Sequence, residues 1–373
     1  MAFSVSYMDL PAQYALIREE ILEAVDEVCS RGAFILRDEV TAFEAAVADR
    51  LSVDHVVGLN SGADALYHSL RALGLRAGDE VITVAHTFVA TLSAIVHCGA
   101  VPVLVDIGDD GLMDVDQICP RITARTRAIL PVHLNGEVCR MDRVMALARE
   151  RGLWVVEDAA QAFGSRYDGR AAGAFGDAGC FSLHPMKTFA VYGDGGFVST
   201  NSESLARDLR IDRDHGQSRE RTVLRYGYSS RLDNLQAAIG IVKLRHFDEW
   251  IARRRQLARQ YHAAFDKLPG LRLPPAPRED PRFFNTFSSY VIRTKAPRAF
   301  QAHLAAAGIE TFSFWTPPLH RCPGLDLEAY SLPKTETVAQ EVLSLTIHPA
   351  LSDEAQRKVI DAIQDFCRQG ATE

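Results

Sequence analysis

Residues 180–187 read CFSLHPMK, and the lysine that ends them is the first candidate for chemistry. Pro185 predicts a turn after a short strand, and the run 192–197 (YGDGGF) predicts a bend back into a second strand. Burial in such a tight, mostly apolar loop lowers a lysine pKa and yields the free amine that Schiff-base chemistry requires. Lys187 is therefore a candidate nucleophile, although a lysine taken alone is more often an ordinary surface-loop residue.

A second candidate is the carboxylate of Asp158, in residues 155–161 (VVEDAAQ). It comes at the C-terminal end of an apolar strand, where open α/β sheets bind their ligands. A carboxylate buried there requires a cationic partner, and a protonated heterocyclic nitrogen would be one. Taken alone, the aspartate fits a helix cap equally well.

The third feature is the run 60–66 (NSGADAL), which lies between a predicted strand and a predicted helix. Small residues at a helix start let backbone N–H groups approach an anion, and the helix dipole favours negative charge there. On its own, the run also fits a plain helix cap at Ser61. Together the three features supply an anion cradle, a partner for a ring nitrogen and an amine for a carbonyl, as pyridoxal 5′-phosphate (PLP) requires.

The elements that must position these residues alternate along the chain. Helical patterns cover 11–31, with a stop at Gly32, and 39–51. Short β-branched or apolar runs then alternate with helical stretches, at 56–59, 81–84, 101–107, 127–133, 154–157, 179–183 and 196–200. Such alternation is typical of an α/β fold with a mainly parallel sheet covered by helices on both faces.

The pattern changes after residue 231. A long helix is predicted over 231–268, with Arg253, Arg254 and Arg255 on a solvated face. A Pro-rich linker over 271–284 precedes strand 288–294, helix 297–307, strand 310–315 and helices 334–343 and 352–367. We therefore expect a large domain over 1–245 and a smaller α+β domain over 246–373.

Composition excludes several classes of function. The 373 residues carry a net charge of −7 without long basic runs, so we expect no nucleic-acid partner. No apolar stretch is long enough to span a membrane and no signal peptide is evident, which predicts a cytoplasmic protein. The seven cysteines are scattered singly, as free thiols are, and the histidines have no metal-ligand spacing. A GxGxxG fingerprint is also absent, which disfavours a nicotinamide enzyme.

The motifs NSGADAL, HTFVAT, PVHLNG, VVEDAAQAFGS, FSLHPMK, GDGG, SSRLDNLQAAIG and PPLH, in this order, resemble the DegT/DnrJ/EryC1/StrS family of sugar aminotransferases. The resemblance covers nearly the whole chain. It implies fold type I, the aspartate aminotransferase-like fold, with PLP as cofactor and its pyridoxamine form (PMP) during turnover. It also implies a homodimer with shared active sites.

The resemblance implies a role for each matching residue. Lys187 corresponds to the lysine that binds PLP covalently, and Asp158 corresponds to the partner of the pyridine nitrogen. Gln161 would lie beside the ring hydroxyl, and Phe88 would stack on the ring. The phosphate would be bound by Gly62, Ala63 and Ser182.

The chain departs from the family pattern in the residues around substrate and phosphate. Ala63 replaces a usual Thr, and Ser229 stands where the second subunit normally supplies an Asn to the phosphate. Phe314 and Trp315 replace a common His-Tyr pair in the sugar pocket. The predicted substrate residues are Arg231, Trp315 and His320.

The reaction implied by the resemblance moves an amino group from an amino acid, with L-glutamate expected, to a nucleotide-linked keto-sugar. The run 230–233 (SRLD) favours the branch that acts on 3-keto sugars. A free keto-cyclitol or keto-octulosonate could also be the acceptor. The family's dehydratase branch, which has His in place of the lysine, and a non-catalytic PLP- or sugar-binding sensor are competing hypotheses.

Overall fold

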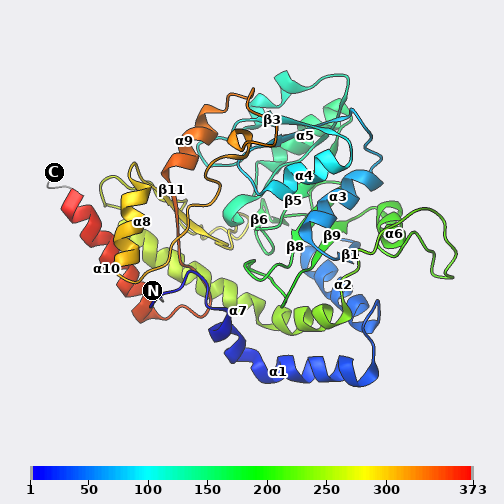
Figure 1. Ribbon diagram of the computed structural model, residues 1–373, viewed down its shortest axis with the longest axis horizontal. Coiled ribbons are helices and arrows are strands. Elements are labelled where there is room, and N and C mark those ends of the chain that lie inside the picture. Colours follow the sequence, from blue (N-terminus) through cyan, green and yellow to red (C-terminus); the bar gives the residue numbers. More distant parts are fainter. Residues whose placement is uncertain (1–2, 371–373) are drawn as a thin grey trace.

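The computed structural model describes residues 3–370 and is built around a seven-stranded sheet (Figure 1). The strand order is β1-β9-β8-β5-β4-β2-β3. All strands run parallel except β9, which is antiparallel to β1 and to β8. The strands are β1 (His55–Leu59), β2 (Glu80–Val84), β3 (Val101–Val105), β4 (Thr126–Ile129), β5 (Trp154–Asp158), β8 (Ala178–Ser182) and β9 (Gly196–Thr200).

Helices cover both faces of this sheet, because side chains of successive strand residues point to opposite faces. Val57 of β1 joins a core cluster with helices α3 to α6, whereas the adjacent Val56 joins a second cluster with α1, α2 and part of α7. The helices are α1 (Leu10–Arg31), α2 (Asp38–Leu51), α3 (Gly62–Ala72), α4 (Val89–His97), α5 (Met141–Arg151), α6 (Glu203–Asp212) and α7 (Asn234–Phe265). The expected α/β fold with a mainly parallel sheet is confirmed.

A smaller unit follows α7. Strands β10 (Tyr290–Arg293) and β11 (Val342–Leu345) pair antiparallel, and helices α8 (Pro297–Ala306), α9 (Pro333–Glu341) and α10 (Asp353–Gly370) surround them. Its core cluster includes Leu257 of α7 and also Val5 from the N-terminal segment. The boundary at 245/246 stays a prediction; it falls within α7, which contributes Ile251 to one cluster and Leu257 to another.

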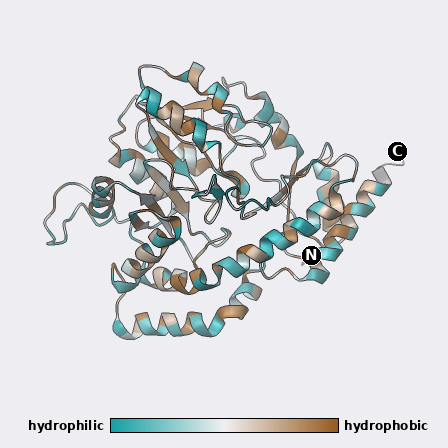
Figure 2. Cartoon of the chain, turned by 180° about the vertical axis from the view of Figure 1, so that it is seen from behind, coloured by the Kyte–Doolittle hydropathy of each residue, from teal (hydrophilic) through white to brown (hydrophobic). Residues whose placement is uncertain are grey.

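The remaining elements are short connections. They are the strands β6 (Arg166–Tyr167) and β7 (Arg170–Ala171), and the 3₁₀ turns η1 (Val115–Gln117), η2 (Cys119–Arg121), η3 (Leu134–Gly136) and η4 (Leu319–Arg321). Hydrophilic and hydrophobic residues alternate around the surface helices in Figure 2, as expected for helices with one buried face. Within residues 3–370, none of the helices combines the length and apolarity needed to cross a membrane.

Most predicted elements are present, but the structure corrects the C-terminal ones. The predicted helix 11–31 ends where Gly32 adopts a φ of +61°. Predicted strand 310–315 is wrong, because only Phe312 forms an isolated bridge, to Ser344. The helix predicted over 334–343 ends at Glu341, and β11 follows it directly.

The prediction of a solvated arginine face on α7 is wrong for two of its three residues. Arg254 and Arg255 are buried. Arg254 Nη1 donates to the carbonyl oxygens of Phe287 (3.2 Å) and Ile347 (2.6 Å). These guanidinium groups bind the helix to the backbone of the smaller unit, since carbonyl oxygens can satisfy buried donors in place of water.

Candidate active site

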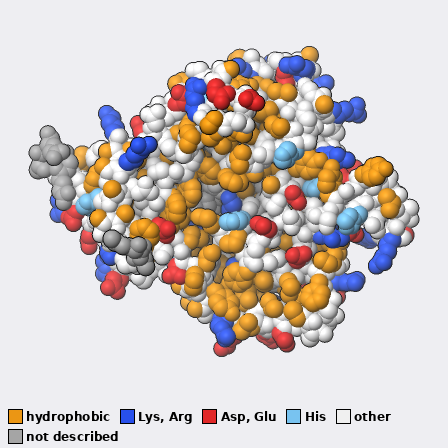
Figure 3. Space-filling model, in the orientation of Figure 1, with side chains coloured by type: hydrophobic (Ala, Val, Ile, Leu, Met, Phe, Trp, Pro, Cys, Tyr) orange, Lys and Arg blue, Asp and Glu red, His pale blue; other side chains and the backbone are white. Residues whose placement is uncertain are grey.

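The predicted site residues lie at the carboxyl edge of the sheet. The parallel strands β1, β8 and β5 end at this edge, and Asp158 of β5 stands opposite Cys180 of β8. Gly196, the first residue of β9, pairs with both Leu59 and Ser182, which brings the ends of β1 and β8 together. The face seen in Figure 3 is hollowed near its centre, over β5, β6 and β8 of Figure 1, and hydrophobic side chains gather around the hollow.

The start of α3 has the features of an anion cradle. Ser61 caps the helix and accepts hydrogen bonds from Asp64 N–H on its hydroxyl (3.1 Å) and Ala65 N–H on its carbonyl (3.0 Å). The N–H groups of Gly62 and Ala63 at the helix start can therefore donate hydrogen bonds to an anion. A Cβ at Gly62 would lie only 2.7 Å from Ser182 Cβ, so only glycine fits between the helix and β8.

Ser182 adds a hydroxyl to this cradle. Its Oγ accepts the N–H of His184 at 3.3 Å, which leaves the hydroxyl proton free to be donated. The position follows from the strand that ends there, since Ser182 is the last residue of β8.

Asp158 is buried and forms no ion pair among residues 3–370. Its Oδ2 accepts a hydrogen bond from the Thr91 hydroxyl (2.7 Å), and its Oδ1 accepts the Ala160 N–H (3.2 Å). Thr91 lies in the first turn of α4 and contacts the Thr87 hydroxyl at 2.7 Å. A carboxylate buried in this way favours a positively charged group beside it, and a protonated pyridine nitrogen fits that requirement.

A buried histidine–glutamate pair fixes the strand end behind Asp158. Glu157 accepts N–H groups from Gly173 (2.8 Å), Phe175 (2.7 Å) and Gly176 (2.7 Å), and it contacts His133 Nε2 at 2.8 Å. His133 Nδ1 accepts the Cys139 N–H at 3.2 Å, so Nε2 carries the proton that is donated to Glu157. Sequence reasoning missed Thr91, although the HTFVAT motif contains it, and it missed this pair.

Lys187 lies in the loop between β8 and β9. Burial lowers the pKa of its amine, and the Asp158 carboxylate opposes this by raising it. No carboxylate within residues 3–370 forms an ion pair with it. Burial thus shifts the titration of the amine toward the neutral form that attacks a carbonyl, and the Asp158 carboxylate is close enough to affect it.

Gln161 follows strand β5 and Phe88 follows strand β2, and β4 lies between these two strands in the sheet. Gln161 Oε1 accepts a hydrogen bond from the Asn135 N–H at 2.9 Å, which leaves the Gln161 NH2 group able to donate hydrogen bonds to a ligand. Phe88 precedes α4 with 58% of its surface exposed, so one ring face is open for stacking. The site residues therefore fit PLP: N–H donors for a phosphate, a carboxylate for the ring nitrogen, an open aromatic face and an amine whose pKa burial lowers.

The predicted substrate residues are placed differently from one another. Trp315 is half-buried, and its ring lies 6.3 Å from the Phe88 ring at 66°. Arg231 forms an ion pair with Asp214 (2.9 Å) and donates to Ser229 Oγ (2.9 Å). His320 is fully buried against Glu336, so the structure brings Trp315 to the site but gives His320 no open face.

The stretch around Ser229 lies beside the first turn of α3. The Ser230 hydroxyl donates to Asp64 Oδ2 at 2.5 Å. Ser229 itself is exposed, and its Oγ accepts only the guanidinium of Arg231 among residues 3–370.

Comparisons with known proteins show which family the chain resembles. The model of the DegT/DnrJ/EryC1/StrS aminotransferase family matches residues 15–364. A "Pleiotropic regulatory protein" of Geobacillus stearothermophilus is 39% identical, with 99% of this chain and 100% of that protein covered. A dTDP-3-amino-3,4,6-trideoxy-α-D-glucose transaminase of Streptomyces venezuelae is 40% identical, with 98% of this chain and 97% of that protein covered.

Solved structures give the same result. DesV of S. venezuelae, in complex with a ketimine intermediate, is 39% identical, has a TM-score of 0.93 and covers 98% of each chain. The ntda protein of Bacillus subtilis, with the cofactor PMP bound, is 29% identical with a TM-score of 0.89, and 97% of this chain and 83% of that chain are covered. The chain therefore belongs to the DegT/DnrJ/EryC1/StrS aminotransferase family and is a PLP-dependent aminotransferase.

Proposed function

We propose that this enzyme transfers an amino group from L-glutamate to a nucleotide-linked keto-sugar, at C3, and so makes an amino sugar. The observation that carries the chemistry is the buried Asp158 carboxylate, which forms no ion pair among residues 3–370, together with the nearby Lys187 amine whose pKa burial lowers. The name of the S. venezuelae transaminase supports both the nucleotide link and the position of the amine. The run 230–233 (SRLD) supports the same branch.

The residues divide the work as follows. When bound, PLP withdraws electrons from the substrate Cα, and Asp158 would hold the proton on the ring nitrogen that makes this possible. Lys187, as general base and acid, would move a proton between the substrate Cα and the cofactor C4′. The N–H groups of Gly62 and Ala63, with Ser182, would hold the phosphate.

Two further residues would orient the ring. Phe88 would stack on its open face, and the Gln161 amide would donate to the ring hydroxyl oxygen. Trp315 and Arg231 are proposed to contact the sugar substrate. His320, which the structure buries, is proposed to support that wall of the site instead.

We propose a cytoplasmic homodimer in which Ser229 of each subunit approaches the phosphate of the other. The exposed Ser229 hydroxyl, next to Arg231, supports this arrangement. The Ser229 side chain is shorter than that of the usual Asn, so its hydroxyl would need a closer approach to the phosphate or a bridging water.

The competing functions differ from this one in their chemistry. The dehydratase branch has His at the position of the lysine, whereas Lys187 is present here and the exposed His184 lies three residues earlier. A regulatory role is suggested by the name of the G. stearothermophilus relative, but a sensor does not require a lysine whose pKa is lowered by burial close to a buried carboxylate. A free keto-cyclitol or keto-octulosonate as acceptor is compatible with the same site.

The test uses the purified enzyme loaded with PLP. Glutamate should bleach the cofactor absorbance and release 2-oxoglutarate, and a nucleotide-linked 3-keto-sugar should restore the absorbance and yield the amino sugar. Nucleotide-linked 4-keto-sugars and free keto-cyclitols serve as matched acceptors. The proposal would be contradicted if a free keto-cyclitol restored the cofactor absorbance faster, or if glutamate did not change this absorbance.

A further inference from the structure

The residue that faces Phe88 is held in a costly backbone conformation. Trp315 has a φ of +67°, in the left-handed region that a bulky residue rarely adopts. Such a conformation persists only when the surrounding contacts determine it. The contacts made by the next six residues, 316–321, therefore determine the position of the Trp315 ring.

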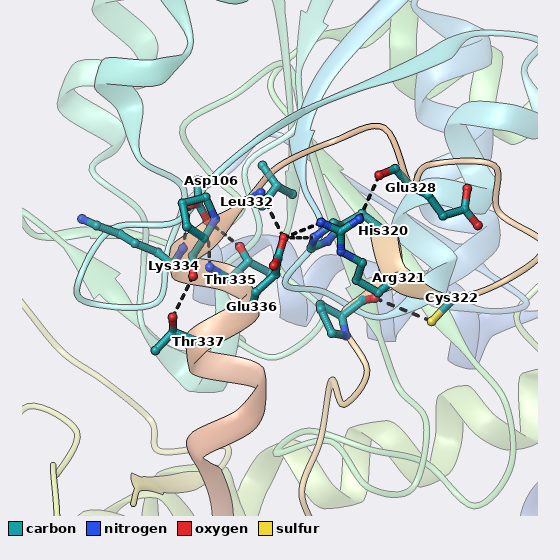
Figure 4. A network of polar contacts seen from close by, with 12 residues as sticks. Asp106, His320, Arg321, Cys322, Glu328, Leu332, Lys334, Thr335, Glu336 and Thr337 are labelled. Atoms are coloured by element: carbon teal, nitrogen blue, oxygen red, sulfur yellow. Dashed lines mark hydrogen bonds and ion pairs between the residues drawn. The ribbon is translucent and has the colours of Figure 1, made fainter. Parts of the chain in front are cut away.

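Helix α9 supplies these contacts at both ends of the segment 316–321, and Figure 4 shows those of Glu336 with His320 and Arg321. At one end, the Thr316 hydroxyl donates to the carbonyl oxygen of Ala339 at 2.5 Å. At the other, Glu336 Oε1 lies 3.1 Å from His320 Nε2 and 2.8 Å from Arg321 Nη2. These hydrogen bonds lower the pKa of Glu336 to about 2, so its carboxylate is charged at neutral pH.

Helix α9 is itself fixed to the large sheet. Its cap residue, Leu332, has no side chain that can accept a hydrogen bond, and Asp106, directly after β3, takes that place. Asp106 accepts the N–H groups of Lys334 and Thr335, each at 2.9 Å, and the Thr335 hydroxyl at 2.7 Å. The buried carboxylate therefore links the end of β3, an edge strand of the large sheet, to the first turn of α9.

Apolar packing places the same region beside Phe88. Leu327 and Leu332 form a cluster with Ala85 and Leu92, which flank Phe88 in the sequence. The chain from Trp315 to α9 thus rests on the turn that presents the Phe88 ring.

We propose that Glu336 is a positioning residue, which fixes Trp315 over Phe88 and thereby selects the ketone acceptor. Glu336 acts through the His320–Arg321 segment rather than by touching the reacting atoms. A ring-shaped acceptor would pack one apolar face on the indole, so a displaced indole weakens acceptor binding and leaves the donor reaction intact. This inference rests on the proposed function, because it assumes that Trp315 borders the acceptor.

The test compares Glu336→Ala, Glu336→Gln and Glu341→Ala. Glu341 is the matched control, because it lies on the same helix and pairs with Arg293 (2.7 Å) outside the Trp315 segment. We expect Glu336→Ala to raise the KM of the ketone by at least about fivefold without slowing the glutamate half-reaction, as a misplaced binding group does. Glu336→Gln, whose amide oxygen still accepts hydrogen bonds, should recover most of that loss, and Glu341→Ala should behave as wild type.

A second readout does not depend on substrate identity. With Trp154 and Trp250 replaced by Phe, Trp315 is the only tryptophan, and its emission and quenching by acrylamide report its surroundings. We expect a change in Glu336→Ala and none in Glu341→Ala.

Unchanged emission in Glu336→Ala would overturn the positioning role, and changed emission with unchanged ketone KM would overturn the role in selection. Failure of the wild type with every ketone would instead refute the proposed function. If Glu336→Ala does not fold, Thr316→Val takes its place, and wild-type emission and ketone KM in that variant would overturn the proposal.

Discussion

The Lys243 amine lies 3.8 Å from the centre of the Tyr192 ring, which belongs to the loop that carries Lys187. Gln236, on the same helix as Lys243, bonds both backbone groups of Tyr192: its Oε1 accepts the N–H at 3.0 Å, and its Nε2 donates to the carbonyl at 2.9 Å. Helix α7 therefore holds this loop by a side-chain amide and by a cation over an aromatic ring.

The burial of Lys243 predicts a pH-dependent stability. Burial lowers the pKa of Lys243 from 10.5 to about 8. The unfolded chain binds the proton more tightly, so the contribution of this group to the free energy of unfolding rises as the pH increases from about 8 to 10.5. Relative to Lys243→Met, the wild type should gain up to about 3 kcal/mol over this range, measured by urea denaturation. Lys267→Met, at an exposed lysine after the same helix, is the control, and parallel wild-type and Lys243→Met curves would contradict the prediction.

Lys187 should carry the cofactor. Reduction of the PLP-loaded enzyme with borohydride, followed by peptide mass mapping, should place the pyridoxyl group on this lysine alone. Lys243 is a second buried amine and thus an internal control. A label on Lys243 or on any other lysine would show that the site assignment is wrong.

Asp158→Asn should keep the shape of the side chain and remove its charge. Its amide oxygen can still accept the Thr91 hydroxyl, but it no longer stabilises a protonated ring nitrogen. We expect the barrier to rise by about 2–3 kcal/mol, roughly 30- to 150-fold in kcat, with little change in Tm. Near-normal turnover in a correctly folded variant would disprove the role of Asp158 in holding this proton.

Shared active sites can be tested by mixing two inactive variants, Lys187→Ala and Ser229→Trp. If Ser229 approaches the phosphate of the other subunit, a hybrid dimer contains one site with neither defect, and activity should return on mixing. Subunit exchange is followed independently with differently tagged chains. Exchange without activity would show that Ser229 does not serve the neighbouring site.

The sequence was sufficient to predict where most strands and helices lie, but it was insufficient to predict the tertiary contacts that hold them together. Gly32 and the apolar runs at 81–84 and 196–200 have strong local signals, so their elements were placed closely. The change from α9 to β11 has no such local signal, because Glu341 and Val342 are adjacent and neither a Gly nor a Pro marks the boundary. The burial of Arg254 was missed because its acceptors are backbone oxygens, which leave no pattern in the sequence.

The partners of the site residues were missed for the same reason. Asp106 and α9 lie more than two hundred positions apart in the chain, and no local rule joins them. One signal was available: a helix that begins with Pro333 after Leu332 has no capping side chain of its own, so its cap must come from elsewhere.

The closeness of Gly196 to the start of α3 has a consequence for biosynthesis. A Cβ on this residue would lie 2.3 Å from the carbonyl carbon of Ser61, so the backbone of β9 forms a wall of the anion cradle. β9 is the last strand of the large sheet to be synthesised. A nascent chain on the ribosome therefore exposes Gly62, Asp158 and Lys187 before it can enclose a phosphate, and stable capture of the cofactor must wait until β9 has emerged and inserted between β1 and β8.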